Sequence, residues 1–153
     1  MLNALQKLVG KKLDINTYDL ILLQAKTNRA LKNKFGEVLD EQKLTTLDWS
    51  VLGILSSQEQ GCRYNIIAQE LAVEPPFVTE LIGKLVKQKL ITIKDDIKDR
   101  RAKLILLSKK GEEVIQDMEQ KLQEHFSTLF KDISASEFET FKNTLQKISG
   151  VSV

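Results

Sequence analysis

The sequence predicts a mainly α-helical fold that carries one small β-hairpin. Apolar residues recur at helical spacing in six separate segments, whereas only two short runs, over residues 90–107, have the composition of strands. The chain has 153 residues, of which 42% are hydrophobic and 29% are charged, as in an ordinary globular domain. We therefore expect four helices, a hairpin and two further helices, in that order.

The first two predicted helices are recognised from their caps and apolar bands. The first runs from Thr17 to about Leu39, with Asn16 as its N-cap. Its apolar band is wider than one face, so we expect it to contact both its own core and a second subunit. The second helix starts near Thr45, with Asp48 at the capping-box position, and we expect Gly61 to close it.

Two short helices with a tight turn between them come next. In the segment NIIAQELAV, Ile67 and Leu71 share the inward face. Pro75 and Pro76 suit the first turn of the following helix, because the amide groups there lack helical partners in any case. That helix turns an apolar stripe inward, formed by Val78, Leu81, Ile82 and Leu85.

A charged hairpin and two terminal helices complete the chain. The runs LITIK and AKLILL flank the polar loop 95–101 and predict two strands with a charged tip. Ser108 can cap a long helix that ends near Phe130, and Ser134 starts a capping-box pattern for the last helix. Both terminal helices carry apolar stripes that a single copy of the chain would leave exposed, which favours a two-fold dimer.

Two short helices followed at once by a hairpin form a winged helix-turn-helix. In that arrangement the second helix enters the major groove of DNA, and the hairpin, or wing, reaches the adjacent backbone or minor groove. Helical steps of about 100° define the outward face of the second helix. The residues expected to face DNA there are Pro76, Thr79, Glu80, Gly83, Lys84 and Lys87. Thr79 can donate to a phosphate or base, and the two lysines can neutralise phosphates.

The charge distribution agrees with a nucleic-acid-binding segment in the middle of the chain. Residues 62–110 hold 11 Lys and Arg against 6 Asp and Glu, whereas the rest of the chain holds 12 against 15. A basic centre between acidic flanks is typical of a DNA-binding lobe attached to an assembly lobe.

From Leu44 to Gly111 the sequence resembles the MarR family of bacterial regulators. The matching segments are LTTLDWSVLGIL, IIAQELAVEPPFVTELIGKLVKQKLI and DDIKDRRAKLILLSKKG. The resemblance implies a winged helix-turn-helix at 44–110, flanked by dimerisation helices within 1–43 and 111–153. Nearly the whole chain is covered, because the long flanking helices also suit the dimerisation lobe of that family.

The most specific part of the resemblance is the wing, with Lys98, Asp99, Arg100 and Arg101 at its tip. It implies that the wing arginines approach the minor groove or the phosphates, and that the aspartate holds an arginine by a salt bridge. Guanidinium groups suit both targets better than ammonium groups do. We therefore expect Arg100 or Arg101 to contact DNA and Asp99 to brace the wing.

The resemblance implies a sequence-specific transcriptional regulator of double-stranded DNA, acting as a repressor and a homodimer. A two-fold dimer would place two recognition helices about one helical turn, or ~34 Å, apart, which predicts a pseudo-palindromic operator. Release by a small-molecule effector is a further implication. Tyr18, Trp49 and Phe126 either line an effector cleft or only fill the core.

Three residues depart from the family pattern. Glu74 replaces the usual serine-like cap, and Lys89 replaces the glycine that often ends the recognition helix. Glu80 stands on the face toward DNA, where it could accept from a cytosine amino group or weaken binding by repelling phosphates. The alternative interpretation is therefore a winged-helix module that binds another protein and has weak or lost DNA binding. DNA binding that falls steeply with salt would distinguish the two.

Other classes of protein have little support. We expect no enzyme, no cofactor and no metal site, because no catalytic set or metal-ligand cluster is present. Cys62 is interpreted as an idle thiol in preference to a redox switch, and His125 as a surface or dimer-face residue. The pair Asp95 and Asp96 is expected to be solvated. The N-terminal sequence has no long apolar run, so we expect a soluble cytoplasmic protein without a membrane span.

Overall fold

The computed structural model describes residues 16–97, 99 and 101–150. Within these residues the order of elements confirms the predicted helices and hairpin. They are α2 (Thr17–Leu39), the short 3₁₀ helix η1 (Asp40–Gln42), α3 (Thr46–Ser56), α4 (Tyr64–Leu71), α5 (Pro75–Lys87), β1 (Ile91–Asp95), β2 (Lys103–Leu107), α6 (Lys109–Leu129) and α7 (Ala135–Ser149).

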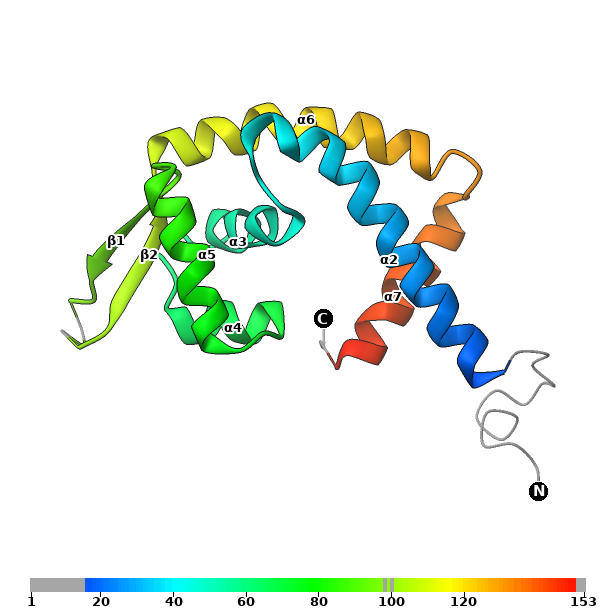
Figure 1. The fold of residues 1–153 in the computed structure, drawn as a ribbon, viewed down its shortest axis with the longest axis horizontal. Coiled ribbons are helices and arrows are strands. Elements are labelled where there is room, and N and C mark those ends of the chain that lie inside the picture. Colours follow the sequence, from blue (N-terminus) through cyan, green and yellow to red (C-terminus); the bar gives the residue numbers. More distant parts are fainter. Residues whose placement is uncertain (1–15, 98, 100, 151–153) are drawn as a thin grey trace, which may run out of the picture.

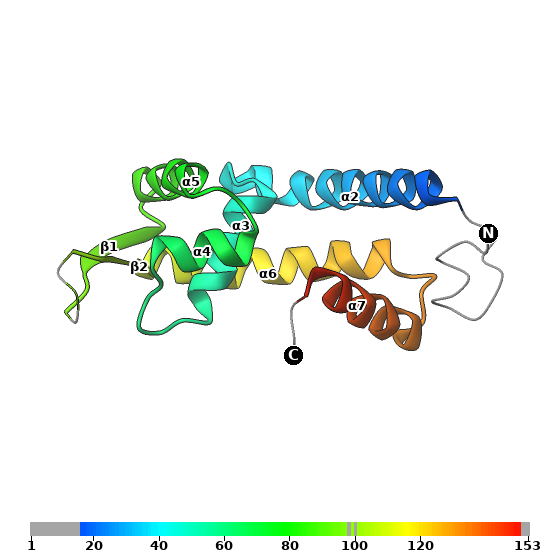
Figure 2. The same ribbon diagram turned by 90° about the horizontal axis from the view of Figure 1, so that it is seen from below.

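The molecule has the shape of an arch. Helix α6 forms the top, the winged-helix elements α3, α4, α5 and the hairpin hang below one end, and α2 and α7 form the other side (Figure 1). A view from below shows α6 running along the molecule from the hairpin to α7 (Figure 2). Helix α6 therefore runs from the winged-helix lobe to α7, and α2 packs against α6.

Local capping sets where three of the helices begin, as the sequence predicted. The Thr45 hydroxyl accepts the Asp48 N–H at 3.2 Å, while the Asp48 carboxylate accepts the Thr45 N–H at 2.7 Å. Ser108 and Ser134 accept backbone N–H groups at the starts of α6 and α7 in the same way. Such caps satisfy amide groups that would otherwise lack a partner.

The prediction that Gly61 closes α3 is wrong. The helix ends at Ser56, and Gly61 lies in the following turn at φ 85°, where its N–H donates to the Gln58 carbonyl at 2.8 Å. A side chain at this position would come within 2.8 Å of Leu106. Glycine is therefore needed where the chain approaches β2.

The wing is a two-stranded antiparallel sheet in which Ile91 lies opposite Leu107. Cys62 adds one bridge to its inner edge, because it exchanges backbone hydrogen bonds of 2.9 and 2.8 Å with Ile105. Lys89 precedes β1 at φ 62°, so the chain adopts the left-handed conformation without the glycine that usually occupies it. Its carbonyl accepts the Ser108 hydroxyl at 2.7 Å, which ties this turn to the start of α6.

One hydrophobic core extends through the winged-helix elements and into α2 and α6. Its fully buried members include Leu39, Leu52, Ile67, Ile82 and Met118. The core thus crosses the segment boundaries near residues 43 and 110 that the sequence indicated, and those boundaries stay predictions. No helix within the described residues is long and apolar enough to cross a membrane.

Candidate nucleic-acid interface

A tight turn sets the recognition helix α5 against α4. Ala72 ends α4 at φ 51°, and the Val73 N–H donates to the Ala68 carbonyl at 3.0 Å. Glu74 is the N-cap of α5, and the two prolines occupy its first turn as predicted. The apolar stripe of α5 is buried beneath this turn, so the opposite face of the helix points outward.

Five of the six α5 residues expected to face DNA are exposed, namely Pro76, Thr79, Glu80, Gly83 and Lys87. The Thr79 hydroxyl donates to the Pro75 carbonyl at 3.3 Å, which leaves its oxygen free to accept. A side chain at Gly83 would meet no atom within 4 Å, so packing within the described chain does not require this glycine. The face is open to a groove, and contact with DNA stays a prediction.

The sixth residue, Lys84, is used inside the protein. Its ammonium group donates to the carboxylate of Asp48, which has no exposed surface and lies on α3. The charge that was expected to neutralise a phosphate is therefore already paired. A pair of residues 36 positions apart leaves no local signal in the sequence.

The tip of the wing is braced as the sequence predicted. The Asp99 carboxylate accepts the Arg101 N–H at 3.1 Å and the Nε–H of the same residue at 3.3 Å. The Arg101 side chain remains 93% exposed, so its guanidinium group is held near one carboxylate while facing solvent. Lys98 and Arg100, the other predicted contacts in the wing, lie outside the described residues.

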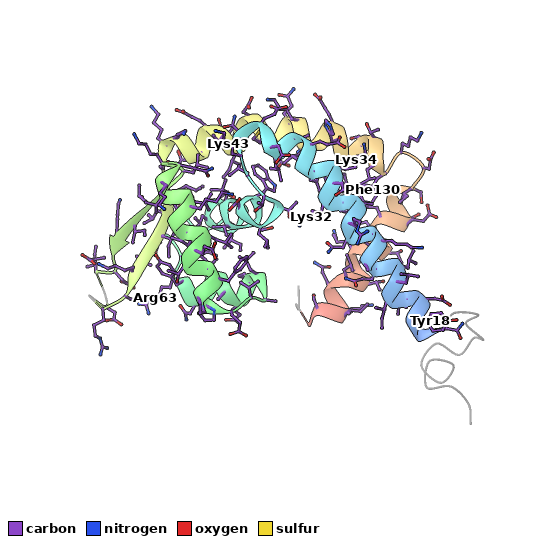
Figure 3. The ribbon with its side chains drawn as sticks, in the orientation of Figure 1. Tyr18, Lys32, Lys34, Lys43, Arg63 and Phe130 are labelled. Atoms are coloured by element: carbon purple, nitrogen blue, oxygen red, sulfur yellow. The ribbon has the colours of Figure 1, made fainter. Side chains whose placement is uncertain are left out.

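The loop of the wing is anchored, where it leaves β1, by a contact that the sequence did not indicate. Arg63 directly precedes α4 (Figure 3). Its guanidinium group donates to the Asp96 carboxylate through Nε at 3.1 Å and also through Nη2. This hydrogen bond raises the pKa of Arg63. Asp96 is buried, so the expectation that it is solvated is wrong, whereas Asp95 is exposed and pairs with Lys103.

The sequence and the fold were compared with those of known proteins. No protein-family model matches the sequence. The HTH-type transcriptional regulator YpoP of Bacillus subtilis is 30% identical over 132 residues, which span 86% of this chain and 92% of YpoP. A MarR-family regulator from Rhodococcus sp. RHA1 has a similar fold, with a TM-score of 0.81 at 20% identity over 90% of this chain and 96% of its own. The chain belongs to the MarR family of transcriptional regulators.

The similarity extends to a structure that was determined on DNA. The S. aureus MepR–DNA complex gives a TM-score of 0.76 at 26% identity and covers 91% of this chain and 100% of MepR. Regulators of this family are DNA-binding winged-helix proteins and not enzymes, in agreement with the prediction from the sequence. The resemblance noted over 44–111 therefore reflects membership of the MarR family.

A cavity of about 490 Å³ lies where α2, α3 and α6 meet in this MarR-family protein. Helices α2, α3 and α6 line it through Phe35, Leu39, Thr46, Trp49, Ser50, Glu119, Leu122, Gln123 and Phe126. Trp49 and Phe126 both line this cavity, and their role in an effector cleft stays a prediction. Tyr18 is not among the lining residues, because it lies at the opposite end of α2 (Figure 3).

Cys62 and His125 occupy positions that suit structural roles. Cys62 is buried, and burial raises the pKa of its thiol, which lowers the fraction of reactive thiolate. His125 is half-buried, with Nδ1 located 3.2 Å from the Lys121 carbonyl one turn earlier. Among the residues that the structure describes, no group of three or more His, Cys, Asp or Glu side chains could hold a metal ion.

Proposed function

We propose that the protein represses transcription by binding a pseudo-palindromic operator as a homodimer. The observation that carries this proposal is the open face of α5 beside a wing whose exposed Arg101 is braced by Asp99. The helix face can enter the major groove while the arginine reaches the minor groove or the phosphates. A dimer bound in this way would cover promoter DNA and exclude polymerase.

The helices outside the winged-helix lobe support assembly of two copies. Helix α2 exposes a run of large apolar side chains, Leu20, Ile21, Leu22 and Leu23, and α7 exposes Phe141, Leu145 and Ile148. Water-exposed apolar surface of this extent marks an interface. A two-fold arrangement would place two copies of α5 about one helical turn of DNA apart, which requires an inverted repeat in the operator.

Glu80 gives the proposed recognition a sequence preference. Its exposed carboxylate lies one residue after Thr79 on the outward face of α5. A carboxylate can accept from the amino group of cytosine, whereas near phosphates alone it is repelled. We therefore expect a C·G pair in each half-site, and substitution of Glu80 by Gln should relax the preference at that position.

Release by an effector is the remaining part of the proposal. The cavity between α2, α3 and α6 is mostly apolar, and its wall includes α3, which packs against the recognition helix. A small aromatic molecule would fit its size and its lining of aromatic rings. Binding there would weaken operator binding if it favours an orientation of α5 that does not match two successive grooves.

Selection of bound duplexes from a random pool tests the proposal most directly. The wild-type protein should enrich an inverted repeat, and its affinity should fall steeply as salt rises because bound counterions are released. The double substitution Arg100→Ala with Arg101→Ala should weaken binding about 100-fold or more, because each protomer loses its charge-assisted wing contact and two positive charges. The matched control Lys32→Ala with Lys34→Ala removes the same charge from α2, away from the wing (Figure 3), and should bind normally.

Other outcomes separate the alternatives. Failure to bind any duplex in dilute buffer would favour the interpretation as a protein-binding module. A reporter gene placed behind the selected operator should be expressed less when the protein is present, and increased expression would reverse the proposed direction of regulation. Enrichment of a single half-site without its inverted copy would contradict the dimeric mode of binding.

A further inference from the structure

The first turn of α3 separates the cavity from the recognition helix. Thr46, Trp49 and Ser50 line the cavity, and these three positions share one face of the helix. Asp48 lies about 150° away around the same turn and meets Lys84 of α5 on the other side. The same turn of helix thus contacts both the cavity and the helix that faces DNA.

The Asp48 carboxylate is short of hydrogen-bond donors for a buried charge. Its Oδ2 accepts the Thr45 N–H at 2.7 Å, the Thr45 hydroxyl at 2.8 Å and the Lys84 ammonium group. Its Oδ1 is also buried, yet no described residue donates to it. An unsatisfied buried oxygen is unusual and calls for a reason other than tight packing.

Stability alone is a weak reason for an ion pair that buries one of its two partners, Asp48, completely. Replacing such a pair by apolar side chains of similar size is often neutral or stabilising, because desolvation offsets most of the attraction between the charges. What a directional pair does provide is one preferred arrangement of the two elements that it joins. Here it joins the cavity wall to the helix that carries Thr79, Glu80 and Lys87.

We infer that the Asp48–Lys84 pair is a positioning device that couples the cavity wall to the orientation of α5. This inference rests on the proposed function. It assigns a regulatory route from the proposed effector site to the DNA-binding face. A shift of the first turn of α3 would move Asp48, and Lys84 would carry that shift to α5. Because coupling between sites is reciprocal, a shift of α5 on binding DNA should also be carried back to the first turn of α3, where Trp49 lies.

Trp49 makes this inference testable without an identified effector, because it is the only tryptophan in the chain and lines the cavity. The experiment titrates the full-length dimer with its selected operator. Trp49 emission and its quenching by acrylamide are followed together with DNA affinity at several salt concentrations. The wild-type protein should show a change of Trp49 emission that saturates with the DNA.

The variant Lys84→Met should bind DNA about tenfold more weakly, within the usual range of coupling energies, and should lose the Trp49 response at saturation. Its salt dependence should equal that of the wild-type protein, because the lysine does not neutralise a phosphate. Lys87→Met is the matched control on the same helix. It should lower the salt slope by about one and keep the Trp49 response. Lys84→Arg should restore the response.

A second variant keeps the test valid if Lys84→Met alone does not fold. Asp48→Asn combined with Lys84→Met removes both charges together and should fold, yet should still lack the Trp49 response. The inference is overturned if wild-type Trp49 is unaffected by bound DNA, if Lys84→Met keeps the full response, or if Lys84→Met lowers the salt slope as Lys87→Met does. Absence of DNA binding by the wild-type protein overturns the proposed function and this inference together.

Discussion

The winged-helix lobe differs from the arm, formed by α2, α7 and the C-terminal end of α6, in how completely it buries its apolar residues. In the lobe, α3, α4, α5 and the hairpin share a closed core with α6. In the arm, α7 has no buried residue, and Ile148 at its end is 77% exposed. The lobe can therefore hold its shape within one chain, whereas the arm has apolar surface that a second chain would cover.

Helix α7 meets the end of α6 through aromatic rings. Phe138 meets Phe126 and Phe130 of the α6 end edge-to-face, with ring centroids 5.4 and 5.3 Å apart. Phe126 also stacks on Phe35 of α2 at 6.0 Å. These rings join the three helices of the arm at one point, and Phe35 and Phe126 also line the cavity. Assembly of the arm and filling of the cavity thus involve the same side chains.

The largest expected effect comes from placing charge on the open face of the arm. Leu145→Asp combined with Ile148→Asp should convert the proposed dimer to a monomer, because two carboxylates would be buried at the proposed interface without partners. DNA affinity should fall about 100-fold or more, since two half-sites would no longer be bound together. Sedimentation and gel-shift titration measure the two effects.

Asn143→Asp is the matched control for that variant, because it adds charge to another exposed position of α7. It should remain dimeric. A dimer that survives the double substitution would show that α7 lies outside the interface.

The next largest effect is expected when the same truncation, leucine to alanine, is made in the lobe and in the arm. Leu52→Ala removes a fully buried side chain from the lobe and should lower the free energy of unfolding by about 3 kcal/mol. Leu22→Ala removes a side chain of α2 that is half exposed, and should cost less than about 1 kcal/mol within one protomer while weakening the dimer. Urea unfolding at several protein concentrations separates the two contributions. If both variants lowered the free energy of unfolding equally, the lobe and the arm would not differ in how much their apolar side chains stabilise one protomer.

Features set by neighbouring residues were predictable from the sequence. The caps at Thr45, Ser108 and Ser134, the apolar stripe of α5 and both strands are confirmed, because each depends on residues only a few positions apart. Gly61 was assigned to the wrong role, since a glycine after a helix signals a left-handed turn without specifying which element the turn belongs to.

Features set by distant residues were not predictable. Arg63 and Asp96 are 33 positions apart and Asp48 and Lys84 are 36 apart, so no spacing in the sequence reveals either pair. The cavity shows the same limit. Trp49 and Phe126 line it, but Tyr18 does not, because the length of α2 carries that ring away from α3.

A smaller effect should follow from loosening the wing. Arg63→Met removes the side chain that ties Asp96 to the start of α4, so the amides of the hairpin should exchange with solvent about three- to tenfold faster. Lys103→Met breaks the exposed pair with Asp95 and is the matched control, because exposed ion pairs contribute little. Hydrogen exchange followed by mass spectrometry resolves the wing from the arm. Equal rates of hydrogen exchange in the two variants would contradict the conclusion that Arg63 anchors the wing.

The smallest effect concerns the capping box of α7, which matters because this helix has so little packing to hold it. Hydrogen bonds from the Ser134 hydroxyl and backbone N–H lower the pKa of the Glu137 carboxyl below its usual value. Its stabilising contribution is therefore fully present above the usual pKa of glutamate and is lost as the pH falls through the lowered value. At neutral pH, Glu137→Gln should slightly reduce the thermal stability of α7, and the difference from the wild-type protein should shrink in acid. Glu139→Gln, outside the capping box, serves as the comparison, and a difference that grows on acidification would refute the assignment.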